Sequence, residues 1–135
     1  MIDVENRIFN IIYQAALACD NTIYCTTETD NAPPSFPAVY VEFIDNYEPD
    51  KFIQSDRKEI FNAVAFNVHV YSSKASGKRA ECRKIMKCID EELSLANYKR
   101  TAYGYVYLTD GNSTILSSKA RYSAVVNVNG NAFTS

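Results

Sequence analysis

The residues of this chain that could do redox or metal chemistry are four cysteines and a single histidine, His69. The cysteines form two pairs, Cys19 with Cys25 and Cys82 with Cys88, and the members of each pair are six positions apart. CxxC redox sites and common zinc knuckles use closer spacings. We therefore expect free thiols in a reducing compartment and no metal site, with Cys82 as a small buried residue.

Motifs for hydrolysis and phosphate binding are incomplete. His69 lies in the middle of a strand pattern without a nearby serine turn, so no hydrolytic triad is indicated. "ASGKRAE" (75–81) has a Gly-Lys pair before a helix but lacks the first glycine and the Ser/Thr of a P-loop. "DEE" (90–92) places three carboxylates in different directions around a helix. We expect no enzyme activity, no catalytic residue and no cofactor.

The predicted helix at 76–95 has its charges in an unusual order. Basic residues crowd its start and acidic residues its end: Lys78, Arg79, Arg83, Lys84 and Lys87, then Asp90, Glu91 and Glu92. A helix dipole favours the reverse order by a few tenths to about 1 kcal/mol per charge. Either these exposed charges are weak and screened, or they pair with a complementary surface on a neighbouring subunit.

These residues need a scaffold, and hydropathy predicts one with the order helix, strand, strand, helix, strand, strand. The expected elements are helices at 3–19 and 76–95, strands at 38–44 and 60–72, and a hairpin at 98–128 that turns at 110–113. Ser73 or Ser76 should cap the second helix, and residues 22–25 form at most a short extended piece. The simplest packing is α+β, a four-stranded, mainly antiparallel sheet with both helices on one face.

Length and charge set the broad class. The 135 residues predict a single domain at 1–128 and a flexible or partner-docked tail at 129–135. The net charge of −2 argues against a general nucleic-acid binder. No apolar run reaches the roughly 20 residues that span a bilayer, and the start of the chain is acidic where a signal peptide is basic.

In this packing one sheet face would remain open and would present aromatic side chains. The expected members of that face are His69, Tyr71, Tyr103, Tyr105 and Tyr107. The chain has ten tyrosines, a residue common at interfaces, and monomers seldom leave a contiguous aromatic patch in water. The pattern favours a protein interface, and the alternative is that tyrosine is simply a good strand former on a half-wet face.

Three segments, in this order and with these gaps, give a more specific indication. They are "SFPAVYVEFIDN" (35–46), "FNVHVYSSKASGKRAECRKIMKCIDEEL" (66–93) and "SSKARYSAVVN" (117–127). Together they resemble the tail terminator (tail completion) proteins of long-tailed bacteriophages, over most of residues 1–128. The resemblance rests on an ordered pattern and not on a catalytic signature.

The resemblance implies a structural virion protein, located in the tail or neck and assembled in the host cytoplasm. Such proteins form a ring, typically hexameric, on the end of the tail tube, stop its growth and offer a surface to the head connector. The partners implied are further copies of the chain, the tail tube protein and the connector protein. DNA would pass nearby without sequence-specific binding, and no cofactor or membrane is involved.

Within such a ring, two sets of residues are expected to make contacts. The predicted subunit interface combines the aromatic face with the polarised helix: Tyr71, Lys84, Lys87, Asp90, Glu91, Tyr103, Tyr105, Tyr107 and Arg121. The long polar connection after the first strand is predicted to face the lumen or the tube, through Tyr47, Glu48, Asp50, Lys51, Asp56 and Arg57. Its acidic excess would let DNA slide past.

Two alternatives stay open at this point. One is a head–tail connector or other neck protein of similar size. The other is a small cytoplasmic module that binds protein or RNA, because domains with this element order and aromatic sheet faces can stack bases. The acidic balance and the lack of a basic stripe near the tyrosines in the sequence argue against RNA.

Overall fold

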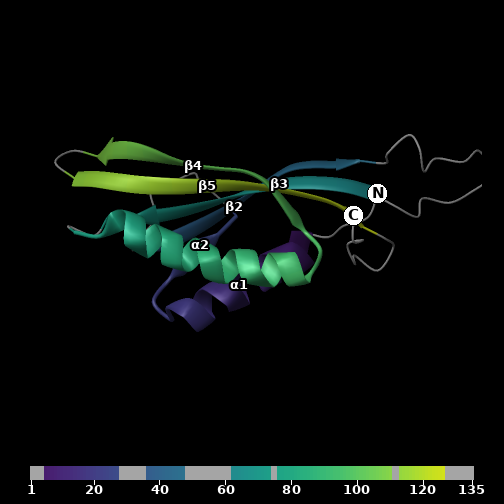
Figure 1. Ribbon diagram of the computed structural model, residues 1–135, viewed down its shortest axis with the longest axis horizontal. Helices are drawn as coiled ribbons and strands as arrows, with labels where there is room; N and C mark the ends of the chain where they lie inside the picture. The colour runs from purple at the N-terminus through teal and green to yellow at the C-terminus, as the bar shows by residue number, and fades with distance from the viewer. Residues whose placement is uncertain (1–4, 28–35, 48–61, 74–75, 111–112, 127–135) are drawn as a thin grey trace, which may run out of the picture.

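The computed structural model describes residues 5–27, 36–47, 62–73, 76–110 and 113–126. It contains two helices and one five-stranded sheet with the strand order β1-β2-β3-β5-β4 (Figure 1). The elements are α1 (Glu5–Cys19), β1 (Tyr24–Thr26), β2 (Ala38–Tyr47), β3 (Asn62–Ser72), α2 (Lys78–Leu95), β4 (Lys99–Asp110) and β5 (Ser113–Val126). β1 pairs with β2 in parallel, and the other neighbouring strands are antiparallel.

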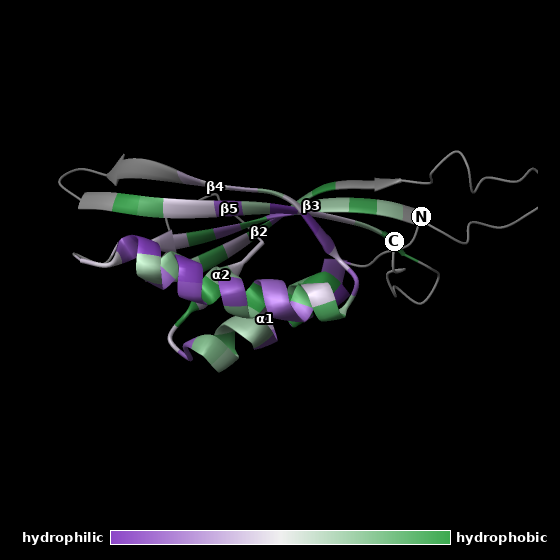
Figure 2. Ribbon diagram, in the orientation of Figure 1, coloured by the Kyte–Doolittle hydropathy of each residue, from purple (hydrophilic) through white to green (hydrophobic). Residues whose placement is uncertain are grey.

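Both helices lie on one side of the sheet and bury its apolar face (Figure 1). β3 is the central strand, and its alternate residues Val64, Phe66, Val68 and Val70 are at most 4% exposed. α2 adds an apolar stripe at helical spacing, and Figure 2 shows these residues alternating with polar ones along the helix. α1 packs against α2 and β2 through Ile8, Ile12, Ala15 and Ala16. The sheet face that contacts the helices is called the covered face below.

The α+β class predicted from the sequence is confirmed, but the four-stranded sheet is wrong. The segment expected to be a short extended piece contains β1, which adds a fifth strand in parallel to β2. An Asx turn after α1 directs the chain there, because the Asp20 side chain accepts hydrogen bonds from the Thr22 amide at 2.9 Å and the Thr22 hydroxyl at 2.6 Å. A strand of three partly buried residues is too short to show a hydropathy period.

The start of α2 also differs from the prediction. Its N-cap is Gly77, which has φ 85° in the left-handed region and no side-chain capping bond, so neither Ser73 nor Ser76 caps the helix. The nearby Ser72 hydroxyl instead donates to the Glu81 carboxylate at 2.6 Å. The predicted domain boundary at 128 and the tail at 129–135 lie outside the described residues.

Candidate interaction surfaces

The sheet face turned away from the helices, called the open face, presents a row of stacked aromatic rings. Tyr40 and His69 are register partners on β2 and β3, and their ring centroids lie 5.2 Å apart at an interplanar angle of 21°. The Tyr71 ring follows along β3, 6.2 Å from the His69 ring and nearly parallel to it at 8°. Each of these residues is partly exposed, so the row is available to a partner.

A carboxylate next to this row holds two of its neighbours in place. Glu42 accepts a hydrogen bond from the Asn67 side-chain amide at 2.9 Å, and its Oε1 lies 3.1 Å from His69 Nε2. Both bonds favour the charged carboxylate, so they lower the pKa of Glu42, the bond from Asn67 having the larger effect. The His69 ring is thereby fixed between Tyr40 and Tyr71.

The lowered pKa of Glu42 predicts how the stability of the fold changes in acid. The folded-state pKa of Glu42 is lowered, so its bonds stabilise the fold above the ordinary carboxyl pKa and are lost as pH falls through the lowered value. We expect the unfolding free energy of Glu42→Gln to fall less steeply than that of the wild type in acid. The side chain is 43% exposed, so screening holds the difference below about 1 kcal/mol. Urea unfolding at several pH values measures it, and parallel pH profiles would contradict it.

β5 adds two exposed cations to the open face. Lys119 is the register partner of His69, and Arg121 is the register partner of Asn67. Glu42 stays charged in these bonds and offsets one of the two cations, so Glu42, Lys119 and Arg121 together leave this part of the face with a small positive surplus. Arg121 was predicted at an interface, and the structure places it beside the aromatic row.

The predicted grouping of tyrosines on the open face is wrong for β4. Tyr103 and Tyr105 are register partners of Ala120 and Ser118, which belong to the covered face of β5. Their rings therefore lie on the side of α2, away from His69 and Tyr71. The Tyr107 backbone pairs in the same hairpin, and its side chain lies outside the described residues.

β4 is an edge strand of the sheet, and Tyr105 on its covered face is a partly buried residue packed against the rim of the core. On its open face it has the small residues Ala102 and Gly104, and on the covered face it has tyrosines with polar tips. The sequence predicts Tyr103 and Tyr105 on the open face, because tyrosine has a polar tip. The pairing of β4 with β5 places both residues on the covered face instead. At this edge Tyr105 contacts Arg79 of α2, and Tyr103 contacts Arg100 of β4 itself.

Arginines and tyrosines alternate along this edge. The Arg79 guanidinium lies 4.5 Å from the Tyr105 ring centroid, and that of Arg100 lies 5.2 Å from the Tyr103 centroid. The Tyr103 hydroxyl donates to the Tyr105 hydroxyl at 3.1 Å. Burial and this bond raise the pKa of Tyr103 to about 12. The same bond, followed by the Arg83 and Arg79 guanidiniums, lowers the pKa of Tyr105.

These contacts explain part of the reversed charge order of α2 within a single subunit. Arg79 lies over the Tyr105 ring of β4, and the Arg83 and Arg79 guanidiniums help to lower the pKa of Tyr105. Near its end, Asp90 accepts a hydrogen bond from the buried Tyr122 hydroxyl at 2.7 Å and lies 3.9 Å from the Arg100 guanidinium. Burial, followed by the neighbouring carboxylate, raises the pKa of Tyr122. Asp90, predicted at a subunit interface, thus has a role inside the fold.

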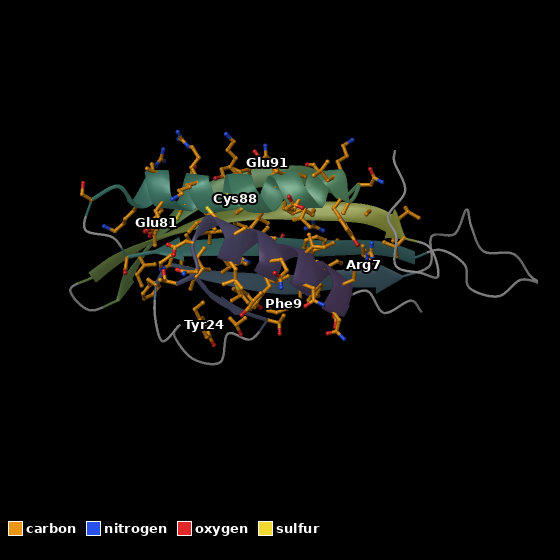
Figure 3. All side chains as sticks on the ribbon, turned by 90° about the horizontal axis from the view of Figure 1, so that it is seen from below. Arg7, Phe9, Tyr24, Glu81, Cys88 and Glu91 are labelled. Carbon is orange, nitrogen blue, oxygen red and sulfur yellow. The ribbon has the colours of Figure 1, made fainter. Side chains whose placement is uncertain are left out.

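Glu91 lines a groove between the two helices, which has a volume of about 650 Å³. Its lining includes apolar and small residues of α1 and two acidic residues of α2: Asn10, Ile11, Gln14, Ala15, Ala18, Cys19, Cys88, Glu91 and Glu92. Figure 3 shows Cys88 on the side of α2 that faces α1. Burial raises the pKa of the Cys19 thiol to about 11. The feature, called the acidic groove below, lies on the opposite side of the subunit from the open face.

The remaining predicted residues are placed as follows. Lys84 lies near the end of α1, where Cys19 and Asp20 line a smaller pocket with it, and Lys87 is exposed. The Tyr47 backbone belongs to β2, which extends past its predicted end, and its side chain is outside the described residues. The other residues of the predicted lumen set are also outside the described part: Glu48, Asp50, Lys51, Asp56 and Arg57.

The sequence places Asn67 on the same strand face as His69, but Tyr40 and Glu42 were missed as members of the open-face cluster. The sequence does indicate that Tyr40 and Glu42 share the open face, because they alternate with the buried Val39 and Val41. Their meeting with His69 depends on the register between β2 and β3, which a single sequence does not specify.

Comparisons with known proteins do not identify a family for this chain. The chain matches no protein-family model, and a search of curated proteins gives no significant match. In the described ranges, no three His, Cys, Asp or Glu side chains are grouped as a metal site. No helix in those ranges is long and apolar enough to cross a membrane.

Proposed function

We propose that this protein is a structural assembly protein that forms a ring and caps the end of a phage tail tube. In this role it stops tube polymerisation and provides the surface that joins the tail to the head connector. The proposal is supported by the ordered sequence segments that resemble tail terminators and by the α+β arrangement of their elements. The single observation on which it rests most is a pair of different surfaces on opposite sides of the subunit.

The two surfaces are complementary in charge. The open face presents Lys119 and Arg121 beside its aromatic row, and the acidic groove presents Glu91 and Glu92. Contact between unlike surfaces is heterologous, so each subunit would leave one surface free for the next. Such head-to-tail association gives a ring when the rotation between subunits closes, typically with six copies in tail terminators.

This arrangement revises the interface predicted from the sequence. Tyr71, Arg121 and Glu91 remain in it, and Tyr40 and Glu92 join it. Tyr103 and Tyr105 do not lie on either surface, and Asp90 is engaged by Tyr122. The tail tube and connector proteins would then contact the rims of the ring.

The mass of the protein in solution tests the proposal. We expect light scattering across a concentration series to show a particle of several subunits that dissociates on dilution, because heterologous contacts are concentration-dependent. Added salt should favour dissociation, since charge pairs contribute to the contact. A monomer at every concentration and salt level would contradict self-association and with it the proposed ring.

A further inference from the structure

A line of exposed cations follows α2 on the side of β4. Arg79, Arg83 and Lys87 are spaced four residues apart, so they lie on one helix face over about 12 Å at 1.5 Å per residue. The guanidinium of Arg79 lies over the Tyr105 ring, which places this face toward β4, and the Arg83 guanidinium helps to lower the pKa of Tyr105.

β4 completes the feature from its own side. Tyr103 is 37% exposed, its ring lies edge-on to that of Tyr105 with centroids 5.4 Å apart, and Arg100 lies over it. We call Arg79, Arg83, Lys87, Arg100, Tyr103 and Tyr105 the arginine–tyrosine strip. It runs along an edge strand, so the neighbouring backbone of β4 is not covered by another described strand.

Two acidic residues of α2 lie next to the strip and offset part of its charge. Asp90 lies 3.9 Å from Arg100 while it also accepts the Tyr122 hydroxyl, and Glu91 is four residues after Lys87 on the same helix. The four cations of the strip outnumber these two acids, so a positive surplus remains in a chain whose net charge is −2. The strip is a basic stripe beside tyrosines. It is not visible in the sequence, because its α2 cations and its β4 tyrosines belong to different elements.

We propose that the arginine–tyrosine strip binds the phosphodiester backbone of nucleic acid without reading the base sequence. Arginine donates two parallel hydrogen bonds to phosphate oxygens, and stacking on tyrosine fixes the guanidinium plane before the ligand arrives. A line of cations matches a polymer with regularly repeated phosphates. A protein partner would instead be expected to meet an apolar centre, and the strip has none beyond its tyrosine rings.

This inference does not depend on the proposed ring. The strip meets the acidic groove only at Lys87, one helical turn from Glu91, so its arginines stay accessible whether the subunit is free or assembled as proposed. Failure of one proposal therefore leaves the other to be judged by its own experiment.

Fluorescence anisotropy with a short labelled DNA oligonucleotide, single-stranded and as a duplex, tests the strip. We expect both probes to bind at low salt, with affinity falling as salt rises. Each phosphate contact contributes about 0.9 to the slope of log K against log salt for a duplex and about 0.7 for a single strand. The triple variant Arg79→Gln, Arg83→Gln, Arg100→Gln should thus lower the slope by about 2 to 3.

Single variants provide the matched control. Arg83→Gln and Arg7→Gln each remove one exposed helix arginine, and Arg7 lies on α1 away from the strip (Figure 3). Arg83→Gln should reduce the slope by nearly one contact, whereas Arg7→Gln should leave it unchanged. Circular dichroism of each variant confirms that it is folded.

Three results would overturn the inference. The first is no binding of either probe at the lowest salt. The second is an equal loss in Arg83→Gln and Arg7→Gln, which would mean that net charge alone matters. The third is stronger binding of a poly-glutamate peptide than of DNA by the strip, which would assign it to an acidic protein partner.

Discussion

Replacing Phe66 by alanine is expected to lower the unfolding free energy by about 3–5 kcal/mol. Phe66 is fully buried on the central strand, and its ring is stacked on Tyr122 at 5.5 Å and edge-on to Tyr98 at 5.7 Å. The substitution removes these contacts and leaves a cavity between strands and helices that cannot collapse fully. For a domain whose total stability is typically 5–15 kcal/mol, such a loss is severe.

Urea unfolding followed by circular dichroism measures the loss, provided that the m-value is unchanged. Phe43→Ala is the matched control, because Phe43 belongs to the same aromatic cluster but is only partly buried, with its ring 6.1 Å from that of Phe66. The control should lose clearly less. Equal losses at the two positions would show that Phe66 is not the centre of the core.

The buried part of the fold was predictable because burial leaves a periodic pattern. Val64, Phe66, Val68 and Val70 alternate along β3, and each points into the covered face as predicted. The apolar stripe of α2 was equally readable, from Cys82 to Leu93. In both cases one face of the element contacts the core over its whole length, so hydropathy and position agree.

The surfaces were less predictable because they depend on neighbours that are distant in sequence. Tyr103 and Tyr105 have the spacing of an exposed strand face, yet the register between β4 and β5 places them on the covered side, where Arg79 of α2 lies over the Tyr105 ring. Likewise, Glu42 meets His69 only because β2 and β3 pair in one particular register. Periodicity locates a face, but it does not say which polar groups meet on it.

The same logic applies to the charge order of α2. Seen alone, cations at its start and acids at its end oppose the helix dipole. In the fold, Arg79 and Arg83 have Tyr105 beside them, Asp90 has the Tyr122 hydroxyl, and Glu91 and Glu92 remain at the acidic groove. The last two are thus the acids of this helix left for a neighbouring subunit in the proposed ring.

Reversing the charge of the open face should therefore abolish ring formation. In Lys119→Glu, Arg121→Glu, two exposed cations of β5 become acids that would face Glu91 and Glu92 of the neighbour. Like charges in contact cost several kcal/mol, and each 1.4 kcal/mol is tenfold in affinity. We expect the concentration for half-assembly, measured by light scattering, to rise by about a hundredfold or more, with the unfolding free energy nearly unchanged because both side chains are exposed.

A compensating variant distinguishes a specific contact from a general effect of charge. Glu91→Lys, Glu92→Lys alone should also weaken assembly, because it would place cations against Lys119 and Arg121. Combining the two double variants in one chain exchanges the signs at every contact, so assembly should return toward that of the wild type. If the combined variant assembles no better than either parent, the open face and the acidic groove are not partners, because a direct contact requires the two changes to offset each other.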